Sequence, residues 1–135
     1  MTSEKVISLT RKLISYNTIN PPGNEMEVAK YVGGLLKDNG FDVEYSVFGK
    51  ERLHVVAAKG LSGYSPPIVL SGHFDTVPLG VKKWSFDPLA GEVVDGKIYG
   101  RGSSDMKSGV AAIIAASVLA FEEDPPAGGV RLIFT

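Results

Sequence analysis

A histidine and an aspartate two residues apart are the first candidates for chemistry in this sequence. His73 and Asp75 belong to the segment 71–77, which directly follows the apolar run 68–70 and so places them at the carboxyl end of a predicted strand, where open α/β sheets bind their ligands. Side chains two residues apart in extended backbone point to the same side. His73 is therefore predicted to hold a metal through one ring nitrogen, while Asp75 accepts a hydrogen bond from the ring and fixes its tautomer. The alternative is a surface histidine beside an aspartate that begins a turn.

A glycine-rich turn supplies the third candidate, Asp105. The segment 100–105 joins a predicted strand to an alanine-rich helix and is expected to deliver Asp105 at the first helical turn, where a carboxylate is electrostatically favoured. A simple helix cap is the competing interpretation. The glycine pattern excludes phosphate-binding loops. Met106 stands where the Walker motif needs glycine before Lys107-Ser108, and Asp105 stands where the dinucleotide motif needs its third glycine.

Composition narrows the possible partners. The 135 residues carry 14 basic and 15 acidic side chains, so a net charge of −1 provides no basic excess for nucleic acid. There is no cysteine, so any metal must be held by histidine and carboxylate groups. The amino terminus lacks the apolar core of a signal peptide, and no apolar run approaches the ~20 residues of a membrane span. We therefore expect a cytoplasmic protein without a nucleic-acid or membrane partner.

Hydrophobic periodicity predicts three helices. The first covers about 3–16. The second has Asn24 as its cap with Glu27 three residues later, which is a capping-box spacing, and it ends at Gly40. The third covers about 106–122 and cannot continue through the prolines that follow it.

Six short runs read as strands, and they lie at 42–48, 53–58, 68–71, 91–94, 97–99 and 130–134. Asp95-Gly96 is a two-residue hairpin turn signal between the fourth and fifth. Helices that alternate with strands predict the α/β class, here a layered α/β/α sandwich with a mixed, partly parallel sheet in one domain, 1–135. Because the sequence stops on an apolar strand, we expect a truncated part of a larger domain.

Two motifs together resemble one known family. Residues 71–78 (SGHFDTVP) and 100–109 (GRGSSDMKSG) look like the metal-binding motifs of the zinc aminoacylase and carboxypeptidase family, which includes acetylornithine deacetylase and succinyl-diaminopimelate desuccinylase. The resemblance extends to 20–25, 84–89 and 95–100, and so to essentially the whole chain. The segment between the two motifs favours the deacetylase and desuccinylase branch over the tripeptidases.

The resemblance implies a role for each candidate. His73 would bind one zinc ion, Asp105 would bridge two, and Asp75, a catalytic residue in the family, would clamp His73. The complete site would hold two Zn²⁺, with Co²⁺ or Mn²⁺ as possible replacements. These metals would activate a water molecule and polarise the amide carbonyl of an N-acyl amino acid or small peptide.

The resemblance also implies what this sequence lacks. In the family, a Glu-Glu pair that supplies the general base follows the strand resembling 130–135, and the sequence stops before it. Two later ligands and an inserted dimerisation (lid) domain are absent as well. We therefore expect the amino-terminal part of a catalytic domain from a homodimeric parent, inactive by itself. The alternatives are a carboxypeptidase or dipeptidase of the same family, and a non-catalytic binding module.

The remaining notable residues are assigned structural roles. Glu122-Glu123 precedes the last strand and is interpreted as a solvated helix end rather than a substitute for the missing pair. His54 is predicted to pack within its strand. Trp84 is predicted to pack beneath the metal loop, the glycine-rich turn that carries Asp105. Arg101 is expected to anchor its own loop, with contact to a substrate carboxylate as the alternative, and Lys107 is expected to lie in solvent on the first helical turn.

Overall fold

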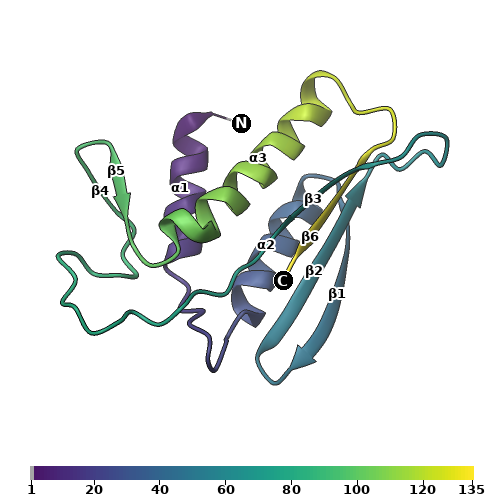
Figure 1. Cartoon of the computed structure of the whole chain (residues 1–135). Helices are drawn as coiled ribbons and strands as arrows, with labels where there is room; N and C mark the ends of the chain where they lie inside the picture. The colour runs from purple at the N-terminus through teal and green to yellow at the C-terminus, as the bar shows by residue number, and fades with distance from the viewer. Residues whose placement is uncertain (1) are drawn as a thin grey trace.

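A computed structural model describes residues 2–135 (Figure 1). The helices are α1 (Ser3–Ile14), α2 (Met26–Asp38) and α3 (Ser108–Glu123). The main sheet contains β1 (Asp42–Gly49), β2 (Arg52–Lys59), β3 (Ile68–Gly72) and β6 (Val130–Phe134). A separate hairpin consists of β4 (Glu92–Val94) and β5 (Lys97–Tyr99). Each predicted helix and strand is present, with ends that match the prediction or are shifted by a few residues.

The main sheet is mixed, as predicted. Its strand order is β1-β2-β6-β3, so β6 lies between two strands that precede it in the sequence. β1 pairs antiparallel with β2, β2 pairs antiparallel with β6, and β3 pairs parallel with β6. The register is defined by Phe134, which lies opposite Val55 of β2 on one side and Gly72 of β3 on the other. The mixed sheet with helices packed on it confirms the α/β class.

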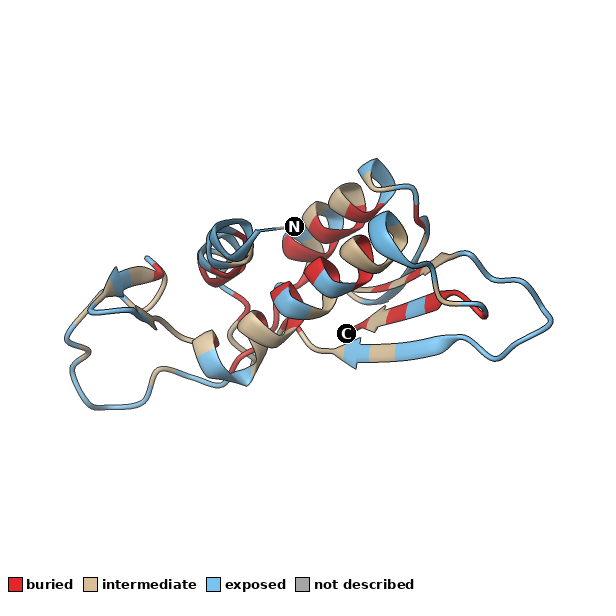
Figure 2. Cartoon of the chain, turned by 90° about the horizontal axis from the view of Figure 1, so that it is seen from above, coloured by how far each residue is buried: buried red, intermediate tan, exposed pale blue. Residues whose placement is uncertain are grey.

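In the part of the chain that the structure describes, the three helices lie on one side of this sheet (Figure 2). Strand residues alternate accordingly: Val55 and Ala57 of β2 are fully buried, and their neighbours Val56 and Ala58 are partly exposed. The buried face packs on α2 and α3, and α1 packs on α3. The second helix layer of the predicted sandwich is therefore not among residues 2–135.

The start of α2 differs from the prediction. The cap residue is Glu25 rather than Asn24, and no side chain caps the helix. The amide of Met26 instead donates to the carbonyl of Glu51, 2.9 Å away, in the β1–β2 turn. This long-range bond replaces the local capping box, which is why the sequence pattern was misleading. The buried stripe of α2 contains Val28, Val32 and Leu36.

α3 is a core helix. Val110, Ile114 and Val118 are buried along one side of it. Together with the turn before it, the stretch Ser103–Glu123 is long and apolar enough to cross a membrane by length and composition, with a mean hydropathy of 1.4. This corrects the expectation that no segment comes near that size. Core helices of soluble proteins meet the same criterion, so the stretch is weak evidence for a membrane span.

Candidate metal centre

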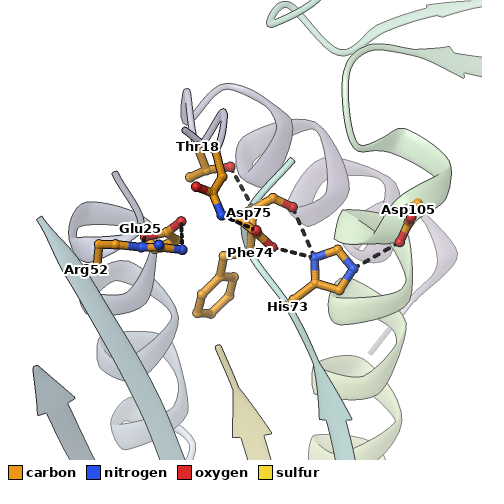
Figure 3. A network of polar contacts seen from close by, with 8 residues as sticks. Thr18, Glu25, Arg52, His73, Phe74, Asp75 and Asp105 are labelled. Atoms are coloured by element: carbon orange, nitrogen blue, oxygen red, sulfur yellow. Dashed lines mark hydrogen bonds and ion pairs between the residues drawn. The ribbon is translucent and has the colours of Figure 1, made fainter. Parts of the chain in front are cut away.

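The backbone around His73 is fixed by the sheet. Beyond β3, the amide of Thr135 donates to the carbonyl of Gly72 at 3.1 Å, and the amide of Phe74 donates to the carbonyl of Thr135 at 2.7 Å. Phe74 is fully buried and packs against Phe134, with ring centroids 5.6 Å apart. Its side chain points into the core, and the side chains of His73 and Asp75 point away from it (Figure 3).

Asp75 holds one nitrogen of the His73 ring. Nδ1 of His73 lies 2.9 Å from Oδ1 of Asp75 and 3.0 Å from the Asp75 carbonyl oxygen. Both oxygens are acceptors, so Nδ1 carries the proton and donates. The opposite nitrogen, Nε2, is then the one directed away from Asp75. This is the bracing geometry that the sequence predicted for the pair.

Asp105 lies against that second nitrogen. Its Oδ1 is 3.0 Å from His73 Nε2, and its side chain is 85% exposed. The expected position of Asp105 in the first turn of the helix is wrong. Its backbone is extended (φ −129°, ψ 100°) within the irregular turn Ser103–Lys107, and α3 begins at Ser108.

Gly102 explains why this turn is irregular. Its φ of +84° is in the left-handed region, and a Cβ there would lie 2.7 Å from Cγ2 of Thr76. The amide of Lys107 donates to the carbonyl of Gly102 at 2.9 Å, which closes the turn around Asp105. The carboxylate is thus presented by a tight loop rather than by a helix.

Lys107 was predicted to be solvated, and this prediction is wrong because the side chain is buried. It is 1% exposed, and its Nζ donates to the carbonyl of Tyr16 at 2.7 Å. Burial lowers the pKa of Lys107 to about 8, since a low-dielectric environment disfavours the charged form. The side chain therefore connects the loop of Asp105 to the segment that follows α1.

The structure also reveals two contacts that the sequence analysis missed. Nδ2 of Asn20 donates to Oδ2 of Asp75 at 3.0 Å, across 55 residues of sequence. Glu25, 0% exposed, forms a two-pronged ion pair with Arg52 at 2.9 and 3.1 Å. The hydrogen bond to Glu25, partly offset by burial, raises the pKa of Arg52 above its usual value. No spacing in the sequence signals either contact.

Asn20 and the candidate metal-site residues line a cavity of about 510 Å³. His73, Asp75 and Asp105 are among its lining residues, as are Trp84 and Arg101. Nη2 of Arg101 donates to the carbonyl of Pro78 at 3.1 Å, and its guanidinium lies over the Trp84 ring at 5.1 Å. The predicted loop-anchoring role of Arg101 is confirmed, and Trp84 packs against this arginine at the start of the metal loop.

His54 and the Glu122-Glu123 pair lie outside this cavity. The His54 ring stacks on Phe48 at 3.8 Å, which confirms the predicted packing role. Glu122 and Glu123 are exposed at the end of α3, so their assignment to a helix end is confirmed.

The electrostatics of the centre favour the protonated form of the His73 ring. Partial burial lowers the pKa of His73, but the bonds and charges of Asp105 and Asp75 together raise it above its ordinary value. Imidazole and carboxylate are also suitable ligands for zinc. Within residues 2–135, however, no three His, Asp or Glu side chains gather as a metal-binding group. The donors present therefore fit one part of a metal site.

The fold and these donors together define an α/β protein with a histidine–carboxylate cluster at the end of β3, and three comparisons identify its family. The family model described as peptidase family M20/M25/M40 matches residues 69–135. The succinyl-diaminopimelate desuccinylase of Wolbachia pipientis wMel is 45% identical over 113 residues, which cover 83% of this chain and 27% of the relative. The succinyl-diaminopimelate desuccinylase of Rhodospirillum centenum is 38% identical over 134 residues, which cover 96% of this chain and 34% of the relative.

A solved structure shows the same fold. An M20 family metallo-carboxypeptidase from Sulfolobus solfataricus superposes with a TM-score of 0.83 at 19% identity, over 99% of this chain and 30% of that one. The chain belongs to peptidase family M20/M25/M40. It spans about a third or less of the length of the relatives it matches.

Proposed function

We propose that the complete protein is a metal-dependent hydrolase that cleaves the amide bond of N-acyl amino acids, with N-succinyl compounds as preferred substrates. The observation that carries the proposal is the alignment of Asp75, His73 and Asp105. Asp75 holds Nδ1 of the ring, and Nε2 lies 3.0 Å from the Asp105 carboxylate. The desuccinylase names of the relatives support the acyl group.

Each residue has a proposed part in this reaction. His73 and Asp105 would be ligands in a two-zinc site, and Asp75 would keep the His73 ring oriented with its proton on Nδ1. Bound zinc would activate water and polarise the scissile carbonyl. A ligand nitrogen must be unprotonated, so metal binding would displace the proton that Nε2 shares with Asp105.

The 135-residue chain is proposed to be the amino-terminal part of a catalytic domain, without activity of its own. Two donors are fewer than the three or four that zinc requires, and a general base is still needed. We further propose a homodimeric, cytoplasmic parent protein, in keeping with the resemblance described above. A carboxypeptidase or dipeptidase reaction on the same centre is the alternative within the family.

The test uses protein made from the complete reading frame. Zinc-dependent release of free amine is measured on N-succinyl and N-acetyl amino acids and on dipeptides. We expect His73→Ala and Asp105→Ala each to lower kcat/KM more than a hundredfold, because groups that merely brace a metal ligand already cost about 10- to 100-fold. His54→Ala is the matched control, since it removes the other histidine of this chain from outside the cavity.

The substrate preference then decides between the reactions. Faster cleavage of N-succinyl substrates supports the desuccinylase proposal, and faster cleavage of dipeptides supports the alternative. A zinc-loaded protein that releases no amine from any of these substrates refutes the hydrolase and leaves a non-catalytic binding module.

A further inference from the structure

A short segment before α2, residues 18–25, runs beside the end of β3 and reaches Asp75 (Figure 3). Its backbone pairs with the residues that follow β3. The amide of Asn20 donates to the carbonyl of Thr76 at 2.8 Å, and the amide of Thr76 donates to the carbonyl of Thr18 at 2.9 Å. The Thr18 hydroxyl adds a buried bond to the carbonyl of Phe74 at 2.6 Å. The backbone of Asn20 is therefore fixed relative to His73 and Asp75.

The far end of the segment is fastened as well. Glu25 is fully buried against Arg52, and Gly23 leaves the room that this ion pair needs. A Cβ at Gly23 would lie 2.7 Å from Nε of Arg52 and 2.8 Å from Oε1 of Glu25. Held at both ends, the segment presents the Asn20 amide in one place.

With Asn20 in place, both oxygens of the Asp75 carboxylate have a partner. Oδ1 lies 2.9 Å from His73 Nδ1, and Oδ2 accepts from Asn20 Nδ2 at 3.0 Å. The terminal torsion of an aspartate is broad, so a single bond leaves the carboxylate free to pivot. The second bond fixes the plane of the carboxylate and thereby the direction of its bond to the ring.

We propose that Asn20 is a positioning residue, which orients the Asp75 carboxylate so that Nε2 of His73 is aimed at Asp105. The inference rests on the proposed function, because it assigns Asn20 a part in preparing the same metal centre. Asn20 acts through Asp75 and not on the metal. Nδ1 also lies 3.0 Å from the Asp75 backbone carbonyl, a contact that does not involve Asn20, so the expected effect is moderate.

The experiment compares zinc affinity and kinetics in protein from the complete reading frame. Zinc affinity is measured by chelator competition, and amide hydrolysis is followed as kcat and KM. We expect Asn20→Ala to weaken zinc binding about tenfold, at the low end of the effects of groups that brace a ligand, and to lower kcat more than it changes KM. Asn20→Asp keeps the shape but replaces the donor with a second carboxylate, so its effect should be at least as large.

Asn17→Ala is the matched control. Asn17 is an exposed asparagine three residues earlier, and its side chain accepts from the amide of Ile19 rather than contacting Asp75. It should stay within about twofold of wild type in zinc affinity, as surface substitutions usually do. A merely structural role of Asn20 would lower Tm and leave zinc affinity unchanged, and that result would overturn the inference.

The outcomes separate this inference from the proposed function. If the wild-type protein binds zinc but hydrolyses no amide, the reaction is refuted, and the zinc affinities of the Asn20 variants still decide the role of Asn20. If the wild-type protein is active and both variants keep its zinc affinity, the inference alone fails. A wild-type protein that binds no zinc refutes both.

Discussion

The two halves of the candidate metal centre are held in different ways. His73 and Asp75 follow a strand of the sheet, and their side chains are 36% and 32% exposed. Asp105 is 85% exposed and lies in a turn whose backbone departs from helix geometry. On the strand side, side chains are oriented by other side chains, as Asn20 orients Asp75. On the loop side, the backbone and a buried lysine set the position, and the carboxylate itself stays accessible.

The largest expected effect is on the strand side. Arg52→Met should destabilise the protein by about 3 kcal/mol, because it leaves the buried carboxylate of Glu25 without its partner. Urea unfolding measures this, with Arg131→Met, an exposed arginine of β6, as the control. The double variant Arg52→Met, Glu25→Leu should recover much of the loss. Equal unfolding midpoints for Arg52→Met and the control would contradict a fastening role for the ion pair.

The loop side should respond less strongly. Lys107→Ala is expected to cost about 2 kcal/mol, through the lost bond to the Tyr16 carbonyl and the lost packing of the buried side-chain stem. The loss is smaller than for Arg52, since burial already penalises the ammonium charge. Thermal unfolding is compared with that of Lys30→Ala, an exposed lysine of α2. If the two lysine variants have the same unfolding temperature, Lys107 does not stabilise the loop.

The smallest expected effect is the difference between two glycine-to-alanine substitutions, which distinguishes steric crowding of the new Cβ from backbone strain. Gly102 and Gly96 both have a positive φ, +84° and +72°, so alanine is strained at either position. Only the Cβ at 102 would meet a neighbour, Cγ2 of Thr76 at 2.7 Å, while 96 is open. Gly102→Ala should therefore cost about 1 kcal/mol more than Gly96→Ala in unfolding experiments. Equal costs would mean that the loop yields to accommodate the methyl group.

Local patterns predicted the features that depend on neighbouring residues. The Asp95-Gly96 turn has the positive φ values, +49° and +72°, that its sequence signals, and β6 has the predicted bounds 130–134. His73 and Asp75 point to the same side because the period of an extended chain is two. The exposure of alternate residues in β2 follows from the same rule.

Features fixed by contacts between distant segments were not predictable. Asn20 reaches Asp75 across 55 residues, and Lys107 reaches Tyr16 across 91. Asn24 has the spacing of a capping box, but the β1–β2 turn provides the bond that replaces it. The helix signal around Met106 is strong, yet the turn closed by Gly102 keeps Asp105 extended. In each case a tertiary contact prevailed over a local preference.

The position of β6 has a consequence for the order in which this region can assemble during synthesis. β3 carries His73 at its end, and its partner in the described sheet is β6, which the ribosome makes later. The β1–β2 hairpin can form early, because its two strands are adjacent in sequence. β3 must wait through the synthesis of the β4–β5 hairpin and α3, and it gains a neighbour when 130–134 insert beside β2. The histidine is thus synthesised early, but the strand that carries it is fixed only when β6 pairs with β3.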